Sequence, residues 1–386
     1  MKKQALFISD MPPNNGLASS VIFYRHFILL EEKGYEINIL IRELPEKNIV
    51  YPLTWKIKTL AARKWWYPPY KPNNFLKWIR YYILYSEAKP FINEVKPDII
   101  IGFLNGVFYS GLAAFVSKKI KKPLAVFYHD RTEALHFRDN PKMQAVTYKH
   151  NAYVINQAKT VWTISPQLVY NKPQWKNKFK VVYPIPEAVP QKAIWKDWFA
   201  QKPVIGYAGA LYNEVVDVMI RIGKLLEKIN GSLLLMTPIK ENVIRIKEEI
   251  SNVIVAEVRD TTEACSYFVE KASAFIVAYP GDMESMPWID SCFPSKFTQF
   301  AQTGLPILVL APEKAAISYW CINNNWLGYS SNYKEENIVR LLKRVTQKHT
   351  WQAMSDQSIN ATENDFNQHK IQSFLEQDLK AVLQEN

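Results

Sequence analysis

The sequence predicts an α/β protein made of two successive Rossmann-like domains. Three observations lead to this prediction. Short apolar runs, typical of buried parallel strands, alternate with helical stretches, which is the pattern of βαβ units. The alternation begins near the N-terminus and begins again at residue 203. The length of 386 residues is enough for two hydrophobic cores.

The first half opens with a βαβ unit. Residues 5–9 form an apolar run, a loop rich in proline, asparagine and glycine follows, and a helix is expected from about residue 19 to residue 33. Gly34 fits the C-cap position of that helix. The other strands of this half are expected at residues 36–41, 97–102, 123–128, 160–165 and 180–184.

The second half repeats the pattern after a proline-containing linker at residues 184–201. Apolar residues recur at helical spacing in the acidic tail, so a terminal helix is expected to dock by this stripe. The predicted domains are residues 1–190 and 200–355. The strands of the second domain are expected at residues 203–209, 232–236, 253–256, 274–279 and 306–310.

Charge and cysteine content narrow the class of protein. The formal net charge of +12 indicates an anionic partner, which could be a phosphorylated ligand, a membrane surface or nucleic acid. Cys265, Cys292 and Cys321 lie far apart without a metal-ligand or CxxC pattern, which favours a reducing compartment. No apolar run approaches the ~18 residues of a membrane helix, and residues 5–8 are too short for a signal-peptide core. The predicted location is the cytoplasm.

The segment 292–306 is the strongest candidate for chemistry. Ser295 is expected to cap a short helix, and Lys296 lies in its first turn. A helix N-terminus with an added lysine charge suits a diphosphate. Gln299 follows three residues later, on nearly the same face of the helix. Gly304 is expected to end the helix before the next strand.

This segment resembles the Pro-x-Lys-x-x-Glu-Tyr-x-Ala-x-Gly-x-Pro motif of glycosyltransferases with the GT-B fold, especially those of family 4. The resemblance implies two Rossmann-like domains facing each other across a cleft, with a nucleotide-sugar donor in the second domain. It also implies that a C-terminal helix at residues 356–386 packs back on the first domain. By position, Pro294, Ser295 and Lys296 meet the donor pyrophosphate. Gln299 replaces the acidic residue that binds the ribose, and its carbonyl can still accept one hydroxyl.

Two further donor residues follow from the resemblance. Residues 205–211 resemble the first strand and turn of the donor domain, which brings Gly209 to the donor. The basic pair that many family members have after this strand is missing, so Lys296 is expected to bear more of the phosphate charge. Arg259 borders the base pocket in this interpretation, and the alternative is an ordinary surface loop.

Other candidates lie where predicted strands end. His129 and Asp130 follow a strand of the first half, and they are expected to face the cleft as catalytic residues, or to form a polar pair that satisfies a loop. Gly16 lies in the first strand-to-helix loop, where it would allow close backbone approach to a ligand or serve as a plain turn glycine. Asp282 and Glu284 could bind sugar hydroxyls or belong to a solvated loop.

Basic and aromatic residues interleave in the segment 51–90. Tryptophan and tyrosine favour a membrane interface, and lysine and arginine favour anionic headgroups. The alternatives are an aromatic core segment with solvated lysines and a nucleic-acid surface. The last is disfavoured because no nucleic-acid-binding motif is present elsewhere. The segment predicts an anionic membrane partner, and a peripheral position on the inner face of the cytoplasmic membrane.

The expected function is therefore that of a glycosyltransferase of the hexosyltransferase type. It would transfer a sugar from a nucleoside diphosphate to a carbohydrate or lipid-linked acceptor, in the synthesis of cell-surface polysaccharide. No cofactor or metal is expected, because fixed positive charges would stabilise the diphosphate and no DxD string is present. A non-catalytic GT-B partner and a nucleotide-sugar epimerase remain as alternatives. A nicotinamide oxidoreductase is disfavoured because no GxGxxG follows either first strand.

Overall fold

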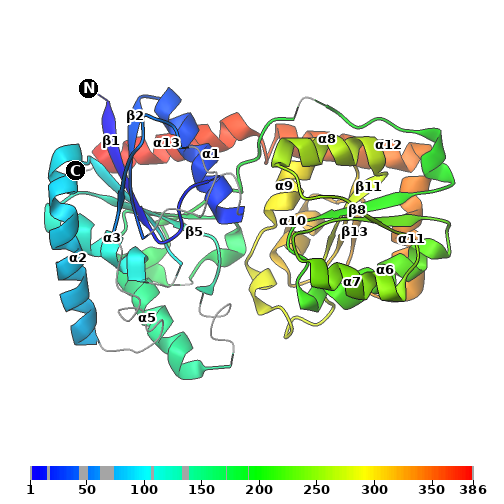
Figure 1. The fold of residues 1–386 in the computed structure, drawn as a ribbon, viewed down its shortest axis with the longest axis horizontal. Coiled ribbons are helices and arrows are strands. Elements are labelled where there is room, and N and C mark those ends of the chain that lie inside the picture. Colours follow the sequence, from blue (N-terminus) through cyan, green and yellow to red (C-terminus); the bar gives the residue numbers. More distant parts are fainter. Residues whose placement is uncertain are drawn as a thin grey trace. The chain divides into compact units, whose positions relative to one another are not determined.

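The computed structural model describes residues 2–14, 18–42, 51–60, 74–105, 108–132, 139–170, 172–189 and 191–384. Gly16 lies outside the described residues, and so do residues 61–73 of the basic and aromatic segment. The chain divides into two compact units. Unit 1 consists of Met1–Val182 and Gln372–Asn386, and unit 2 consists of Tyr183–Ile371. Each unit contains one parallel sheet (Figure 1).

The sheet of unit 1 has seven strands in the order β3-β2-β1-β4-β5-β6-β7. The predicted strands of this half are all present. The additional strand β3 was missed because its side chains are largely exposed, so that it has no apolar run. The strands are β1 (Lys3–Ser9), β2 (Tyr35–Ile41), β3 (Lys56–Thr59), β4 (Ile99–Phe103), β5 (Leu124–Tyr128), β6 (Thr160–Thr163) and β7 (Phe179–Val181).

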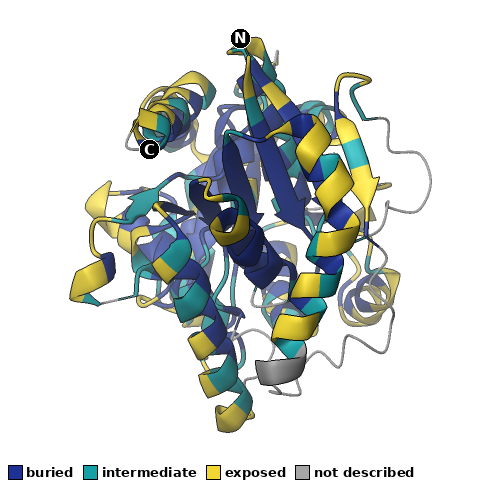
Figure 2. Cartoon of the chain, turned by 90° about the vertical axis from the view of Figure 1, so that its left-hand side faces the viewer, coloured by how far each residue is buried: buried dark blue, intermediate teal, exposed yellow. Residues whose placement is uncertain are grey.

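Helices cover both faces of this sheet. Helices α1 and α13 lie on one side of it, and α2, α3 and α5 lie on the other (Figure 1). The central strands are buried, whereas β3 and the outward faces of the helices are largely exposed (Figure 2). Gly34 follows α1 with a φ of +87°, which agrees with its predicted role at the helix end. The helices are α1 (Ala18–Glu32), α2 (Asn74–Val95), α3 (Phe108–Ile120), α5 (Pro141–Gln157) and α13 (Gln368–Gln384).

Helix α13 docks on unit 1 through buried polar contacts. Asp378 accepts hydrogen bonds from Thr160 Oγ1 at 2.7 Å and from Trp162 Nε1 at 2.8 Å. Gln372 Oε1 lies 2.7 Å from His26 Nδ1 on α1. The predicted return of a C-terminal helix to the first domain is therefore confirmed, but the returning part begins at Gln372 and not at residue 356.

The sheet of unit 2 has six parallel strands in the order β10-β9-β8-β11-β12-β13. Helices α8 and α12 lie on one side of it, and α6 and α7 on the other (Figure 1). The strands are β8 (Val204–Ala208), β9 (Ser232–Met236), β10 (Val253–Val255), β11 (Ala274–Ala278), β12 (Ile307–Leu310) and β13 (Tyr329–Ser330). The helices are α6 (Asn213–Glu227), α7 (Lys240–Glu249), α8 (Thr261–Lys271), α9 (Ser295–Ala301), α10 (Ala316–Asn323), α11 (Glu335–Lys343) and α12 (Lys348–Glu363).

The unit boundaries differ from those expected from the sequence. The first lies between Val182 and Tyr183, so the segment expected as a free linker belongs to unit 2. Helix α12 also belongs to unit 2, because Trp351 is fully buried there and donates a hydrogen bond to the Ser273 carbonyl at 2.7 Å. Within the described residues, no helix has the length and apolar character needed to cross a bilayer.

Candidate functional site

The strand orders indicate where each unit binds ligands. In both sheets the chain order reverses beside the first strand, between β1 and β4 in unit 1 and between β8 and β11 in unit 2. At such a point the loops diverge and leave a crevice outside the carboxyl ends of the strands. In unit 2, Gly209 directly follows β8, and the segment after β11 leads into α9. The predicted donor segment therefore begins at the switch point of unit 2.

Gly209 and Lys296 lie against each other at this point. Gly209 has a φ of +118°, a conformation that side chains other than glycine rarely adopt. A Cβ atom at this position would lie 3.3 Å from Lys296 Cε. The absence of a side chain thus leaves room for the Lys296 stem along the loop. Two residues separated by more than eighty positions in the sequence are thus brought close together.

The loop after β8 is held by hydrogen bonds within unit 2. The Gly209 amide donates to the Met236 carbonyl at 3.0 Å. The Leu211 amide donates to Thr237 Oγ1 at 3.3 Å, and Asn242 Nδ2 donates to the Leu211 carbonyl at 2.7 Å. Thr237 and Asn242 are both buried. The position of the glycine turn is therefore set before any ligand binds.

Helix α9 begins with the predicted lysine in its first turn. Ser295 is the first helical residue and Pro294 is the N-cap, without a side-chain capping bond. Sequence reasoning placed Ser295 at the cap. The structure corrects this by one residue, because Pro294 has the extended backbone conformation of a cap. The first N–H groups of a helix have no partner one turn back, although in α9 the Phe297 amide donates to the Pro294 carbonyl at 3.0 Å. Together with the exposed Lys296 side chain they can bind a phosphate group.

Gln299 has a different environment from Lys296. Its side chain is buried, and its amide pairs with the backbone of one residue. Oε1 accepts from the Glu187 amide at 2.9 Å, and Nε2 donates to the Glu187 carbonyl at 2.9 Å. Both ends of the amide are therefore used within the protein. The structure gives Gln299 a packing role beside the predicted phosphate residues.

The remaining donor candidates lie in exposed loops. Arg259 stacks its guanidinium over the Tyr267 ring, with the central carbon 4.6 Å from the ring centroid. Asp282 accepts a hydrogen bond from the Glu284 amide at 2.7 Å, which shapes a tight turn after β11. Tyr333 supports the same turn by donating to the Tyr279 carbonyl at 2.8 Å. These contacts fix the loops, and they leave the Glu284 side chain exposed.

His129 lies in an apolar environment at the end of β5. It is almost fully buried, and its ring stacks on Phe23 at a centroid distance of 5.1 Å. Burial lowers the pKa of His129 to about 3, and the nearby His26 contributes in the same direction. Nδ1 lies 3.2 Å from Ser19 Oγ on α1. The imidazole is therefore neutral at physiological pH, which favours a hydrogen-bonding role over that of a proton shuttle. Asp130 is half-buried at the same strand end.

Two residues that the sequence analysis missed lie at the same edge of unit 1. Asp10 follows β1 directly, and Asn105 follows β4. The Asn105 side chain hydrogen-bonds the Asp10 carboxyl, whose pKa is raised by burial in spite of this bond and of nearby Arg42. β1 and β4 are neighbours, so this pair lies at the switch point of the sheet. The signal for Asp10 was an acidic residue directly after a strand, the same feature that drew attention to Asp130.

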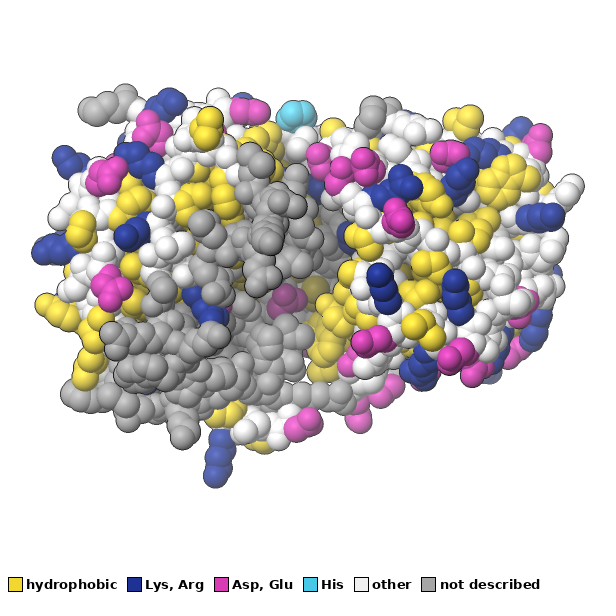
Figure 3. Space-filling model, viewed as in Figure 1, with side chains coloured by type: hydrophobic (Ala, Val, Ile, Leu, Met, Phe, Trp, Pro, Cys, Tyr) yellow, Lys and Arg dark blue, Asp and Glu magenta, His cyan; other side chains and the backbone are white. Residues whose placement is uncertain are grey.

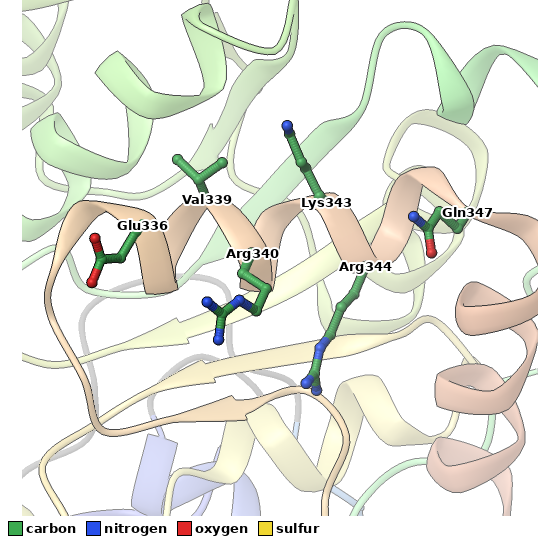
Figure 4. A pocket seen from close by; sticks show the side chains of 6 residues that line it. All are labelled: Glu336, Val339, Arg340, Lys343, Arg344 and Gln347. Atoms are coloured by element: carbon green, nitrogen blue, oxygen red, sulfur yellow. The ribbon is translucent and has the colours of Figure 1, made fainter.

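A shallow surface pocket in unit 2 lies away from these residues. One face of α11 and the turn after it form it, with three basic side chains among six lining residues (Figure 4). The lining residues are Glu336, Val339, Arg340, Lys343, Arg344 and Gln347. None of them was predicted as a site residue. Across the described ranges, no group of three or more His, Cys, Asp or Glu side chains is arranged to hold a metal ion.

Comparisons with known proteins support the fold. No protein-family model matches the sequence, and no curated protein matches it. Solved structures do match across the whole chain. Sucrose-phosphate synthase from Thermosynechococcus elongatus is 12% identical, with a TM-score of 0.73 and coverage of 100% of both chains. HepE from Anabaena, solved in complex with UDP-glucose, is 12% identical, with a TM-score of 0.67 and coverage of 98% of this chain and 99% of that one. WaaG, a glycosyltransferase involved in lipopolysaccharide biosynthesis, is 12% identical, with a TM-score of 0.61 and coverage of 98% of both chains. The chain has the two-Rossmann GT-B architecture of these proteins.

Proposed function

We propose that this chain is a glycosyltransferase that uses a nucleoside-diphosphate sugar as donor. The observation that supports this most directly is the contact between Gly209 and Lys296 at the switch point of unit 2. A glycine turn, a helix N-terminus and a lysine together suit a diphosphate. The likeness to HepE, whose structure contains UDP-glucose, agrees with a nucleotide sugar as the ligand. The proposed acceptor is a carbohydrate or a lipid-linked sugar, in the synthesis of cell-surface polysaccharide.

In this proposal, unit 2 stabilises the leaving group. The bond between the anomeric carbon and the diphosphate oxygen breaks, and the electron pair remains on the diphosphate. The N–H groups of the first turn of α9 and the Lys296 ammonium neutralise the charge that develops there. The acceptor hydroxyl forms the new bond to the anomeric carbon and releases its proton. Because these charges are fixed in the protein, we propose that transfer proceeds without a metal ion.

Unit 1 is the proposed acceptor-binding unit. Asp10 follows β1 and Asp130 lies just after β5, two strands along the same sheet, and both carboxylates can accept hydrogen bonds from sugar hydroxyls. His129 holds the end of β5 from within the aromatic cluster. We retain His129 and Asp130 as proposed site residues and add Asp10. Of the two carboxyl groups, Asp10 lies at the switch point, and a half-buried carboxyl group there is suited to receive the proton of an acceptor hydroxyl.

The thermal stability of the protein with nucleotides tests the donor site. A ligand present at ~100 times its dissociation constant stabilises the folded state by roughly 2.7 kcal/mol. We expect one of UDP, GDP, dTDP and CMP to raise the melting temperature, and Lys296→Ala to abolish this rise. The control is Lys247→Ala, which removes an exposed lysine from α7. No rise with any of the four nucleotides in the wild-type protein would contradict the proposed donor site.

We further propose that unit 1 contacts an anionic membrane through α2. Among the described aromatic side chains of the segment 51–90, some are buried and others are exposed. Trp55 and Tyr81 are buried, whereas Trp78 and Tyr82 are 43% and 58% exposed on α2. Lys119 Nζ on α3 lies 5.9 Å from the centroid of the Tyr82 ring. Exposed tryptophan and tyrosine beside lysine suit the headgroup region. On the side seen in Figure 3, acidic and basic side chains are interspersed over the surface of unit 2.

Vesicle co-sedimentation tests this surface. Vesicles that contain phosphatidylglycerol are expected to bind the protein more strongly than phosphatidylcholine vesicles do. Trp78→Ala with Tyr82→Ala should reduce the bound fraction. Trp198→Ala should not, although Trp198 is similarly exposed at 39%. If the double variant sediments like the wild-type protein, the membrane surface lies elsewhere or does not exist. In either case we would withdraw the assignment to the inner membrane face.

A non-catalytic GT-B partner is the second candidate. The specific observation in its favour is that position 299, one turn after Lys296, is a glutamine and not an acidic residue, and that its amide is bonded to the Glu187 backbone. Such a protein would bind a nucleotide and show no turnover. Measuring sugar transfer and donor hydrolysis with a panel of nucleotide sugars separates the two candidates. A nucleotide-sugar epimerase would instead change the donor without an acceptor.

A further inference from the structure

Helices α2, α3 and α5 of unit 1 bring together polar side chains that the proposed transfer reaction does not use. Lys77 lies in the first turn of α2, Ser110 in the first turn of α3, and His150 on α5. The His150 ring stands between the other two, because Lys77 Nζ lies within hydrogen-bond distance of Nδ1 and Ser110 Oγ lies 2.8 Å from Nε2. Tyr81 of α2 and Tyr153 of α5 complete this group, which we call the three-helix cluster.

Lys77 is a half-buried cation without a carboxylate beside it. Among the residues that the structure describes, its neighbours are the His150 ring nitrogen and the Tyr81 ring, whose centroid lies 5.7 Å from Nζ. Burial lowers the pKa of Lys77 to about 8, and no described carboxylate opposes this shift. Lysines that leave the solvent are usually paired with an acidic group. The cluster therefore presents a positive charge that the described protein does not neutralise.

The His150 imidazole fixes the direction of the hydrogen bonds. An ammonium group can only donate, so Nδ1 accepts from Lys77. The neutral ring then carries its hydrogen on Nε2, which donates to Ser110 Oγ. His150 and Ser110 are both buried, so these bonds hold the lysine head from within the helix packing. An ammonium has three N–H groups and His150 uses one of them, which leaves donors for a ligand.

Two phenol groups of the cluster add further donors. The hydroxyls of Tyr81 and Tyr153 are buried and have no hydrogen-bond partner within the described residues. Gly111 makes room for this arrangement, since a Cβ atom there would overlap the Tyr81 hydroxyl and lie 2.6 Å from His150 Cε1. Burial raises the pKa of Tyr81, and the nearby Tyr153 contributes in the same direction. Buried hydroxyls without a partner are uncommon, and a ligand or water that accepts from them explains their place.

The cluster lies at the sheet edge where unit 1 is proposed to bind its acceptor. The connection from β4 to α3 is short and contains Asn105, the partner of Asp10. The first turn of α3 therefore lies at the carboxyl end of β4. The exposed Trp78 ring packs on the cluster, at centroid distances of 5.7 Å from Tyr81 and 5.2 Å from Tyr153. An apolar surface thus borders the unused donors.

We propose that the three-helix cluster binds a phosphate group, and that this group belongs to a lipid-linked acceptor. The cluster offers a ligand the Lys77 ammonium, two phenol hydroxyls and the first turns of two helices, all of which favour negative charge. A phosphate group has the charge and the several acceptor oxygens that such a set of donors requires. The lipid-linked acceptor as source rests on the proposed function, whereas the phosphate site itself does not.

Calorimetric titration with inorganic phosphate tests the site. The full chain carries Lys296→Ala throughout, so that the proposed donor site does not contribute. Lys77→Met should weaken phosphate binding by roughly 10-fold or more, the contribution of a charge-assisted hydrogen bond. Tyr81→Phe removes a hydroxyl that has no partner within the described protein, so this variant should fold. It should lose roughly 2-fold to 10-fold in affinity.

The matched control is Lys142→Met. Lys142 also lies in the first turn of a helix of unit 1, α5, but it is exposed. It should bind phosphate as the background protein does. An equal loss in Lys142→Met and Lys77→Met would overturn the site, because it would show a general effect of charge. Unchanged binding in both Lys77→Met and Tyr81→Phe would overturn it as well.

Octyl phosphate, below its micelle concentration, tests the source of the phosphate. If the Trp78 surface receives a lipid, octyl phosphate should bind more tightly than inorganic phosphate by roughly 10-fold or more, since each buried methylene group adds to affinity. Equal affinities would overturn the lipid-linked acceptor as the source. If no nucleotide binds at Lys296 but phosphate binding still depends on Lys77, the proposed function fails and the phosphate site stands.

Discussion

At the scale of single residues, Gln299 lies where the resemblance places it, next to the predicted phosphate residues, but its side chain binds the protein backbone. The position resembles one that is acidic in family-4 glycosyltransferases, and the sequence analysis expected the Gln299 carbonyl to accept one ribose hydroxyl. The structure instead gives the side chain two backbone bonds to Glu187, a residue 112 positions away in the chain. That partner could not be predicted from sequence, because nothing in the Glu187 segment marks it as the neighbour of α9. The donor roles of Lys296 and Gly209 stay predictions, which could be made from the sequence because the signals that carry them are local.

The environment of Gln299 predicts that the substitution Gln299→Glu lowers the free energy of unfolding of unit 2. Gln299→Glu keeps an acceptor for the Glu187 amide but replaces the donor to the Glu187 carbonyl with a carboxylate oxygen in a buried site. A buried unpaired charge or acceptor costs about 2–4 kcal/mol. We expect denaturant unfolding of unit 2 to show a loss of this size. Gln357→Glu should cost less, because the Gln357 side chain, which bonds to the Leu327 amide and the Asn325 carbonyl, is half-exposed. A fully stable Gln299→Glu variant with tighter nucleotide binding would mean that this side chain reaches the ribose.

At the scale of elements, helix α13 is part of the unit 1 core. The sequence analysis predicted a docking helix from its apolar stripe, and it placed the returning segment too early because α12 is also amphipathic and precedes it without a long break. The distinction depends on buried partners. Trp351 of α12 bonds to Ser273 in unit 2, while Asp378 of α13 bonds to β6 in unit 1. Helical periodicity alone cannot identify which sheet a helix covers.

Removing the Asp378 carboxylate should weaken unit 1 selectively. Asp378→Ala leaves the buried Thr160 hydroxyl and Trp162 indole without this acceptor. Hydrogen bonds to a charged group contribute about 1.5–3 kcal/mol each. We expect faster hydrogen exchange in β6 and β7. The matched variant Asp365→Ala removes the acceptor of Trp320 Nε1 in unit 2 and should leave exchange in β6 unchanged. Equal effects of the two variants on β6 would contradict this assignment of α13.

At the scale of the whole molecule, the chain contains two parallel sheets with the same order of strands, and this repetition made the two-domain fold predictable from the sequence. Buried parallel strands are continuous apolar runs, so the alternation of strands and helices is visible in the sequence. The strand β3 was not predicted, because its side chains are exposed and form no apolar run. Asp10 was not predicted as a site residue, because a single carboxylate after a strand is a weak signal without its partner Asn105. The crossings of the chain between the units were misplaced, because their positions depend on contacts between segments that are remote in sequence.

The central claim is that Lys296 and the start of α9 bind the diphosphate of a nucleotide donor. The most direct measurement compares the dissociation constants of a nucleoside diphosphate and of the corresponding nucleoside, for the wild-type protein and for Lys296→Ala. A charge-assisted hydrogen bond contributes about 1.5–3 kcal/mol, which corresponds to roughly 10-fold to 150-fold in affinity. We predict a loss of this size for the nucleoside diphosphate and an unchanged constant for the nucleoside. An equal loss for both ligands, or no loss for either, would contradict the claim.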